Sequence, residues 1–242
     1  MLRSVPRRWV LVALSLACAL AASCVDAVRA ADAPRPRNIL LMIADDQGLH
    51  AGCYGDTVVK TPNIDKLAAD GVRFTNAYAG VASCSPSRAV ILSGMLNHSN
   101  GQYGLAHAEH NFHSRPNIRG LPVLLREHGY RSAVIGKYHV LPESAYQFDK
   151  QIPNNGRDGA TMARAAAEFL KETPDQPFFL LMGYTDPHRA GQGFGNAQDY
   201  PGLSPVKYDP AAVKVPPFLP DEPEVRADLA DYYQSVSRFD QG

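Results

Sequence analysis

Three apolar runs, each ended abruptly by polar or charged residues, constrain the fold of this chain most. The runs and the segments that end them are residues 38–44 before Asp45 and Asp46, residues 131–135 before residues 136–139, and residues 177–183 before residues 186–188. A short, continuous apolar run is typical of a strand that is buried on both faces of a parallel sheet. The sequence therefore predicts at least three such strands.

Helical patterns separate these runs. A helix is predicted over residues 61–69, another over residues 121–128 with Gly129 as its stop, and a third from the capping residue Asp158 to Lys171, whereas residues 72–77 predict a strand or an extended segment. This alternation predicts an α/β fold, with a doubly wound, mostly parallel sheet between helices. At 45% hydrophobic residues, the 242-residue chain can bury a core, which argues against disorder.

Polar side chains at the strand ends predict a functional site. In open α/β sheets, ligands bind beyond the carboxyl ends of the strands. Each of these side chains alone has an ordinary structural explanation, but together they converge on one edge. They are Asp45, Asp46, Lys137, His139, Asp186 and His188.

Residues 1–30 have the pattern of a signal peptide. Three arginines precede an apolar run at residues 9–22, and residues 28–30 offer small side chains before the predicted cleavage point. The run is shorter than the roughly 20 residues that a membrane span needs. We expect export to the periplasm or beyond the cell; the arginine pair at 7–8 also fits a twin-arginine signal, and Cys24 is a weak lipoprotein site.

Charge and cysteine content exclude two classes. The formal net charge is +0, and the leader holds four arginines and one aspartate, which leaves the rest of the chain negative. We therefore expect no nucleic-acid partner. Beyond the leader only Cys53 and Cys84 remain, too few for a disulfide framework, and we expect Cys53 to be a packed thiol.

Cys84 is predicted to lie just before the first turn of a helix. Pro86 suits the first helical turn and Gly94 suits the helix stop. The helix dipole and free N–H groups favour negative charge there, and Arg88 lies one turn further on, from where it can reach back toward residue 84. The alternative is that Cys84 is a small buried hydrophobic residue.

These residues carry a resemblance to a known family. Cys84 to Arg88 (CSPSR), with the LSG at residues 92–94, resembles the signature of the type I sulfatases of the alkaline phosphatase superfamily, in which the cysteine is oxidised to formylglycine. The same resemblance is carried by residues 45–47 (DDQ), 136–139 (GKYH) and 186–189 (DPHR). It extends from about Pro36 to the end of the chain and is strongest to the sulfamidase branch, the heparan N-sulfatases.

The resemblance implies an alkaline-phosphatase-like fold and a sulfatase site. The implied catalytic residues are Cys84, Arg88, Lys137, His139 and His188, and the implied ligands of one Ca²⁺ are Asp45, Asp46 and the modified Cys84. In this scheme the two cationic residues neutralise the aldehyde hydrate and the sulfate, His139 takes the proton that triggers sulfate release, and His188 faces the leaving atom.

The resemblance also implies that the chain is incomplete. The family completes its metal site with an Asp-Asn or Asp-Asp pair on a later strand, and residues 238–242 resemble the helix that precedes that strand. We therefore expect residues 31–242 to be the N-terminal part of a sulfatase catalytic domain, truncated before the last core strands and the C-terminal subdomain. The remaining metal ligands would then lie outside this sequence.

Several functional alternatives stay open at this point. Within the superfamily, the runner-up is a sulfatase for aryl or carbohydrate O-sulfates. A cysteine hydrolase using Cys84 and His139 would leave the aspartate pair at 45–46 unexplained, and an inactive fragment would only bind sulfated glycan. For a sulfatase we expect a sulfated sugar substrate and a formylglycine-generating or sulfatase-maturating enzyme as partners.

Two loops are less informative. His107, His110 and His113 recur every third residue in a polar segment, which predicts a surface loop; a sugar pocket or a metal site is the alternative. Residues 191–205 are rich in Gly, Asn and Pro and predict a long loop at the mouth of the site.

Overall fold

The structure, a computed structural model, describes residues 36–107, 109–191 and 193–242. Residues 38–242 form one compact unit. The predicted leader, with its arginine pair at 7–8 and Cys24, lies outside the described residues. Among the described helices, none is long and apolar enough to cross a membrane.

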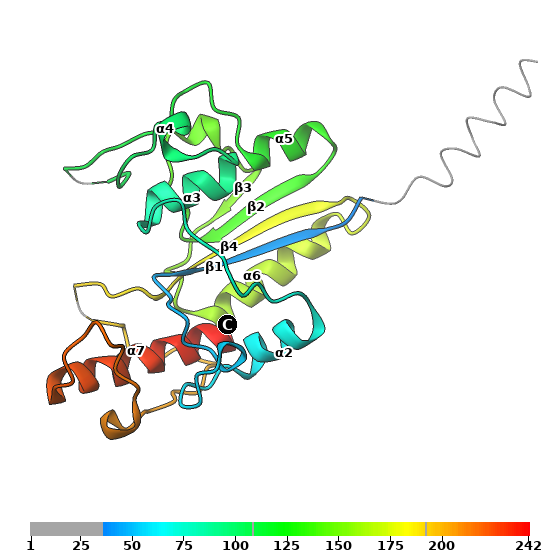
Figure 1. Cartoon of the computed structure of the whole chain (residues 1–242). Coiled ribbons are helices and arrows are strands. Elements are labelled where there is room, and N and C mark those ends of the chain that lie inside the picture. The colour runs from blue at the N-terminus through cyan, green and yellow to red at the C-terminus, as the bar shows by residue number, and fades with distance from the viewer. Residues whose placement is uncertain (1–35, 108, 192) are drawn as a thin grey trace, which may run out of the picture. The chain divides into compact units, whose positions relative to one another are not determined.

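Four parallel strands form the central sheet of this unit (Figure 1). The strands are β1 (Ile39–Asp45), β2 (Arg131–Gly136), β3 (Lys150–Ile152) and β4 (Phe178–Pro187). Their order across the sheet is β1-β4-β2-β3, and all three pairings are parallel. The strand β4 thus lies between β1 and β2, which brings the carboxyl ends of the three predicted strands to one edge.

Helices cover both faces of the sheet. The α-helices are α2 (Pro62–Asp70), α3 (Cys84–Ser93), α4 (Asn97–Asn100), α5 (Leu121–Glu127), α6 (Gly159–Glu172) and α7 (Pro223–Gln241), and short 3-10 helices lie at Gly52–Tyr54, Glu143–Ala145 and Pro210–Ala212. Figure 1 shows α3 and α5 on one side of the sheet and α6 and α7 on the other. The predicted doubly wound α/β fold is therefore confirmed.

The alternation of side chains along β4 builds two cores. Phe179 and Leu181 pack with Leu92 of α3 on one face. Leu180 and Met182 pack with residues of α6, such as Phe169, on the other. Because successive side chains of a strand point to opposite faces, one continuous apolar run supplies both cores.

One feature of β1 differs from the prediction. Its apolar run predicted burial on both faces, but Leu40 and Met42 are 51% and 44% exposed. The strand lies at the edge of the described sheet, and its Met42 side chain lines an open groove with Leu67 and Phe239 instead of a packed interface. An apolar run alone does not distinguish a central strand from an edge strand.

Other segments also depart from the prediction. Residues 72–77, predicted as a strand or an extended segment, form no strand, and Val72 and Phe74 are 82% and 67% exposed. The strand β3 was missed because it has only three residues. Of α7, only the last residues were expected to be helical. The predicted helix that Asp158 caps is present, and the Asp158 carboxylate accepts a hydrogen bond from the Thr161 N–H at 2.9 Å.

Candidate active site

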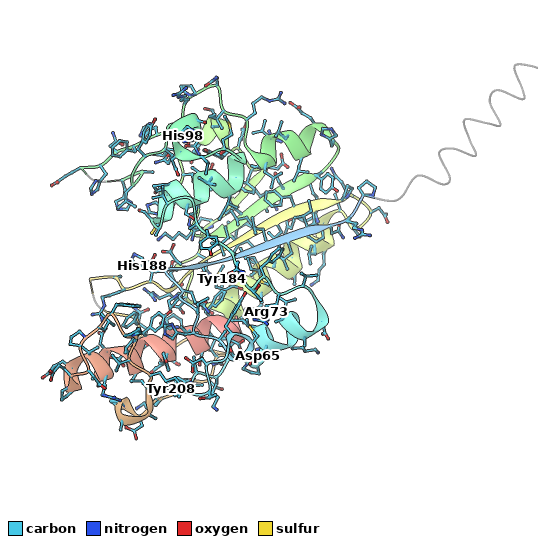
Figure 2. All side chains as sticks on the ribbon, viewed as in Figure 1. Asp65, Arg73, His98, Tyr184, His188 and Tyr208 are labelled. Atoms are coloured by element: carbon cyan, nitrogen blue, oxygen red, sulfur yellow. The ribbon has the colours of Figure 1, made fainter. Side chains whose placement is uncertain are left out.

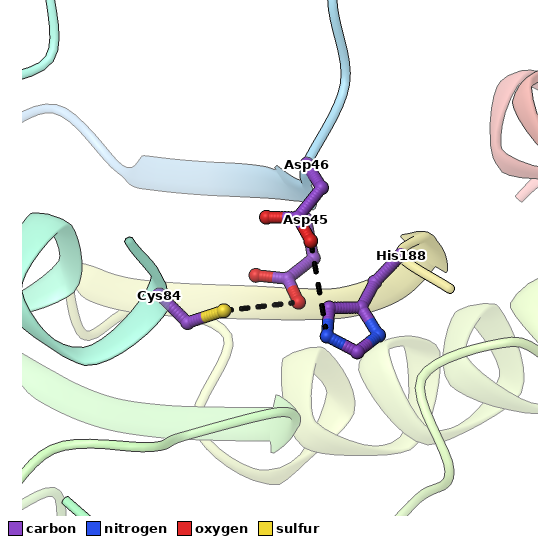
Figure 3. A group of neighbouring side chains, drawn as sticks. All are labelled: Asp45, Asp46, Cys84 and His188. Atoms are coloured by element: carbon purple, nitrogen blue, oxygen red, sulfur yellow. Dashed lines mark hydrogen bonds and ion pairs between the residues drawn. The ribbon is translucent and has the colours of Figure 1, made fainter. Parts of the chain in front are cut away.

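The carboxyl edge of the sheet gathers most of the predicted site residues. The elements deliver them as follows: β1 ends at Asp45, followed by Asp46; β2 is followed by Lys137 and His139; β4 is followed by His188; and α3 begins at Cys84 with Arg88 one turn further on. Figure 3 shows Cys84 and His188 approaching the two aspartates from opposite sides. His188 is also marked in Figure 2, far from His98 near α4.

Asp45 is the centre of this arrangement. Its carboxylate forms ion pairs with Arg88, at 3.2 Å, and with Lys137. The Cys84 thiol donates to Asp45 Oδ2 at 3.7 Å, a long contact even for sulfur. The side chains of Asp45 and Arg88 are only 5% and 2% exposed, so this pair is excluded from solvent. A buried ion pair of this kind is costly to desolvate and is retained where it positions groups for chemistry.

The neighbouring cations decide the charge of Asp45. Burial raises the pKa of its carboxyl group, but the hydrogen bond and charge of Lys137 and the charge of Arg88 outweigh it and hold the pKa below its usual value. Asp45 is therefore ionised at neutral pH. A permanent carboxylate next to two fixed cations is an environment that can bind a metal ion on one side and an anion on the other.

Cys84 is the first residue of α3, one position further into the helix than predicted. Ser83 is the N-cap, with extended backbone angles, and Gly94 ends the helix with φ 67°. Burial raises the pKa of the Cys84 thiol, and the Asp45 charge raises it further. A thiol with a raised pKa is a poor nucleophile at neutral pH, which disfavours the cysteine hydrolase alternative.

Arg88 does not reach back to Cys84 through any described hydrogen bond. Its guanidinium instead donates to Asp45 and, at 2.9 Å, to the Lys137 backbone carbonyl. It thus connects α3 to the ends of β1 and β2.

The donor atoms of this cluster lie close enough together to hold a metal ion. One ligand atom from each of Asp45, Asp46, Cys84 and His188 lies within 4.8 Å of the others. The Gln47 Oε1 atom, which lines the same cleft, is buried without a hydrogen-bond partner and adds an oxygen donor. Carboxylate and amide oxygens are the ligands that Ca²⁺ prefers.

A cleft of about 270 Å³ opens beside these residues. Its walls are the end of β1, the loop that precedes α3 and the first turns of α3, and they include Asp45, Asp46, Cys84 and Arg88. Lys137, His139 and His188 are not among its lining residues.

His139 has a strained backbone and an unusual environment. Its φ of 59° lies in the left-handed region, where histidine is uncommon. Burial and the nearby charge of Lys137 lower the pKa of its imidazole to about 4, so the ring is neutral at neutral pH. Its Nε2 atom lies 2.5 Å from Nδ1 of His107, and its Nδ1 atom is buried without a partner.

Two glycines position Lys137. Gly183 of β4 runs so close to the chain after β2 that a Cβ atom there would lie 2.0 Å from the Lys137 carbonyl oxygen. Gly136, with φ 82°, ends β2, and a Cβ atom there would lie 2.4 Å from the Gly183 carbonyl oxygen. Because only glycine permits this approach, the two positions fix where Lys137 leaves the sheet.

Asp186 is not part of the cleft, although its position after a strand predicted that it would be. Its carboxylate is 1% exposed and pairs with Arg157 and Arg238, the latter through contacts of 2.7 and 2.8 Å. Arg157 also donates to the His188 backbone carbonyl at 2.8 Å. Asp186 therefore anchors the end of β4 through two guanidinium groups. Of Asp186 and His188, only His188 reaches the site.

His188 lies beside Asp46. Its Nε2 atom is 3.7 Å from Asp46 Oδ2, and its Nδ1 atom is buried without a partner. The next residue, Arg189, forms an ion pair with Asp228 of α7 and lies over the Phe194 ring at 4.7 Å. The Arg189 guanidinium group is therefore already bound by residues of the same chain.

Of the three loop histidines, only His107 reaches the site. His110 and His113 are exposed, and His113 contacts the Asn111 side chain at 3.0 Å. Among the described residues, the group that could hold a metal includes none of the three. Arg157 was missed by sequence reasoning, because nothing in its local pattern differs from that of a surface residue. Gln47 was noted only as part of the DDQ motif, Arg238 only as part of a helix, and His107 only as a loop residue with a sugar pocket or a metal site as the alternative.

The fold and this cluster define an α/β protein whose carboxylates, cations and nucleophile gather at one edge of a parallel sheet. The yidJ protein of Bacteroides fragilis has a similar structure, with a TM-score of 0.69 at 23% identity over 86% of this chain and 57% of that one. The fold is thus alkaline-phosphatase-like. The sulfatase family model matches residues 37–242, and the chain belongs to the sulfatase family.

Two similar curated proteins are N-sulphoglucosamine sulphohydrolase of Homo sapiens and the ulvan-active sulfatase of Formosa agariphila. The human protein is 42% identical over 86% of this chain and 46% of its own length. The Formosa protein is 35% identical over 72% of this chain and 34% of its own length. The chain thus spans half or less of the curated relatives that it matches.

A solved structure with a bound substrate is also similar. It is a complex with D-glucosamine-2-N,6-O-disulfate, described as the substrate of that protein, and it matches 64% of this chain and 35% of its own at 29% identity and a TM-score of 0.56.

Proposed function

We propose that this chain carries the nucleophile and part of the metal site of a formylglycine-dependent sulfatase. The observation that supports this most is the cluster of Asp45, Asp46, Cys84 and His188, whose ligand atoms lie within 4.8 Å of one another in a member of the sulfatase family. The modification of Cys84 requires a formylglycine-generating or sulfatase-maturating enzyme as a partner.

The chemistry explains the need for an aldehyde. A serine or cysteine that attacked a sulfate would stay sulfated, because water attacks the sulfur of that product slowly. In a hydrated aldehyde, one hydroxyl attacks sulfur, and loss of the proton from the other re-forms the carbonyl and expels sulfate. Covalent catalysis thereby divides one difficult step into two easier ones.

The cationic side chains stabilise the charges of this reaction. Lys137 and Arg88 lie next to Asp45 and are assigned to the hydrate and the sulfate oxygens. His139 is neutral at neutral pH, so it can accept the proton that triggers sulfate release. His188 is assigned to the leaving atom as a hydrogen-bond donor or acid.

Asp45, Asp46 and the modified Cys84 are the proposed ligands of one Ca²⁺. When bound, such an ion polarises the sulfate and favours ionisation of the attacking hydroxyl. The exposed Asp46, at 55%, could turn toward such an ion without disturbing the core.

The proposed substrate is a sulfated glycan with an N-sulfoglucosamine unit, as in glycosaminoglycans. The support is the likeness to human N-sulphoglucosamine sulphohydrolase and to the structure that holds a 2-N,6-O-disulfated glucosamine. An amine leaves poorly as an anion and must be protonated, and His188 is the acid that the strand end provides.

A second candidate is an O-sulfatase. N-acetylgalactosamine-6-sulfatase of Homo sapiens is also 42% identical, although only over 46% of this chain. A protein that only binds sulfated glycan without cleaving it is the remaining alternative. For all of these, the leader at residues 1–30 supports export to the periplasm or beyond the cell.

Two experiments test this function. Chain produced together with a formylglycine-generating enzyme should show Cys84 converted to the aldehyde in tryptic mass spectra and should react with hydrazides; a fully alkylatable thiol at residue 84 would contradict the proposal. The complete, matured enzyme should then release sulfate from N-sulfoglucosamine faster than from glucosamine 6-sulfate or an aryl sulfate. The variant Cys84→Ala is the inactive control, and a preference for either O-sulfate would favour the second candidate.

The role of His188 has its own test. The variant His188→Ala should slow cleavage of N-sulfoglucosamine by about 100-fold or more, the usual range for loss of a general acid, but slow an aryl sulfate less because a phenolate leaves without help. An equal loss of cleavage rate on both substrates would show that His188 does not protonate the leaving group.

A further inference from the structure

His107 contacts His139 directly, although the two residues come from separate parts of the chain. The imidazole rings are nearly coplanar and meet edge to edge, with centroids 4.7 Å apart and planes at 12°, and His107 Nδ1 lies 2.5 Å from His139 Nε2. His107 is exposed, whereas the His139 Nδ1 atom is buried. The pair therefore connects a buried nitrogen beside Lys137 to the solvent.

The loop that carries His107 is attached to the helix of the nucleophile. The backbone N–H of the buried Ala106 donates to the Ser85 hydroxyl at 3.0 Å, and Ser85 directly follows Cys84. The buried Gln102 side chain closes the loop by donating to the carbonyls of Gly104 and Phe112, at 2.7 Å each. These hydrogen bonds fix the position of the loop that carries His107.

The short nitrogen–nitrogen distance has a chemical consequence. Two bare lone pairs would repel each other at this distance, and so would two N–H groups, so one proton must lie between His139 Nε2 and His107 Nδ1. The charges of Lys137, His107 and Arg88 oppose protonation of His139, and the charge of Asp45 favours it. His139 therefore holds an accepted proton weakly, and the proton must be transferred to another group.

We propose that His107 is a positioning and proton-relay residue for His139, and this inference rests on the sulfatase function proposed above. The hydroxyl proton of the sulfated hydrate moves to His139 Nδ1, its O–H electron pair forms the C=O bond, and the C–O bond to sulfate breaks with its electrons on sulfate. The His139 Nε2 proton then moves to His107 Nδ1, and the His107 Nε2 proton leaves to water.

The first test is nuclear magnetic resonance of the whole chain, residues 1–242, labelled with ¹⁵N. Imidazole ¹⁵N shifts report which nitrogen carries the proton. In His107→Ala, the tautomer and the titration of His139 should change, whereas in the matched control His110→Ala, an exposed histidine of the same loop, both should stay as in the wild type. An unchanged His139 spectrum in His107→Ala overturns the proposal.

The second test uses the complete, matured enzyme. It distinguishes a role of His107 in positioning His139 from a role in accepting its proton. Through its Oε1 atom, His107→Gln can still accept a hydrogen bond from His139 Nε2, but it cannot pass a proton on. Both His107→Gln and His107→Ala should lower kcat by about tenfold or more with KM changed less than twofold, and added imidazole should restore part of the His107→Ala rate. The acidic limb of the pH profile of kcat should also move to higher pH in both variants, because the charge of His107 helps to lower the pKa of His139.

The outcomes distinguish the two claims. Full activity of His107→Gln would overturn the relay. An inactive wild-type enzyme whose His139 spectrum still responds to His107→Ala would overturn the proposed function and support the histidine pair.

Discussion

His139 and Asp45 show how burial acts on single residues of this site. Burial disfavours the charged form of both, which lowers the pKa of the imidazole and raises that of the carboxyl group. Lys137 and Arg88 reverse the effect for Asp45 and strengthen it for His139. The same two cations therefore keep the carboxylate charged and the imidazole neutral.

The pKa of His139 predicts how stability depends on pH. The imidazole pKa is about 4 in the folded protein and about 6.5 in the unfolded chain. Between these values the unfolded chain binds more protons, so the contribution of His139 to stability is complete above about pH 6.5 and is lost as pH falls toward 4. Urea unfolding of the wild type across this window should show that loss.

The variant His139→Asn should flatten this part of the pH profile, because asparagine tolerates the left-handed backbone and does not titrate. His110→Asn, at an exposed position, should keep the wild-type slope. Identical slopes in the wild type and in His139→Asn would show that His139 is not held neutral by the fold.

At the level of elements, the close approach of β4 to the end of β2 sets the position of Lys137. In Gly183→Ala, the new methyl group would meet the Lys137 backbone, which cannot move away as a flexible side chain would. We expect a loss of about 1–3 kcal/mol in the free energy of unfolding, the usual range for overpacking, and a disturbed Lys137. Chemical denaturation measures the first effect.

Gly55→Ala is a useful control for this variant. Gly55 has φ 92° and no atom near its Cβ position, so its substitution costs backbone strain without a clash. Of the two variants, only Gly183→Ala should change the chemical shift of the Lys137 side chain. A wild-type Lys137 signal in Gly183→Ala would contradict the role given to this glycine.

The contact of α7 with β4 depends on a buried charge network. Asp186→Asn would leave the guanidinium groups of Arg157 and Arg238, which are 9% and 7% exposed, without their carboxylate. Removing one partner of a buried ion pair typically costs about 3–5 kcal/mol. We therefore expect a loss of this size in urea unfolding.

The exposed pair of Glu168 and Lys171 in α6 supplies the matched comparison, since both side chains are more than 70% exposed. Glu168→Gln should leave the unfolding midpoint almost unchanged. Similar losses in Glu168→Gln and Asp186→Asn would mean that the buried network contributes no more than a surface ion pair.

At the level of the whole molecule, metal binding should stabilise the fold. If Ca²⁺ binds the folded chain and not the unfolded one, then at ten times its Kd it adds about 1.4 kcal/mol, and the thermal midpoint rises. Asp46→Asn is the informative variant, because Asp46 is 55% exposed and its loss should not weaken the core. Calorimetry should show a rise in Tm for the wild type and little rise for Asp46→Asn.

Mg²⁺ at the same concentration is the control for a general ionic effect. A rise in Tm of equal size in the wild type and in Asp46→Asn would place the ion elsewhere on the protein.

The sequence by itself determined the α/β class, the three main strands, the helix that begins at Cys84 and the edge on which Asp45, Lys137 and His188 meet. These features are local, because apolar periodicity, caps and strand ends lie within a few residues of one another. The signature from Cys84 to Arg88 is likewise a contiguous stretch, and it pointed to the sulfatase family before any contact was known.

Only the tertiary structure decided that Asp186 turns away to Arg157 and Arg238, that β1 exposes Leu40 and Met42, and that His107 meets His139 edge to edge. The partners in the first and last of these contacts lie 29 or more residues apart in the chain, and the exposure of β1 depends on the strand order. The physical reason is that hydrophobic patterning specifies which face of an element is buried, whereas the identity of the neighbour follows from packing of the complete sheet and its helices.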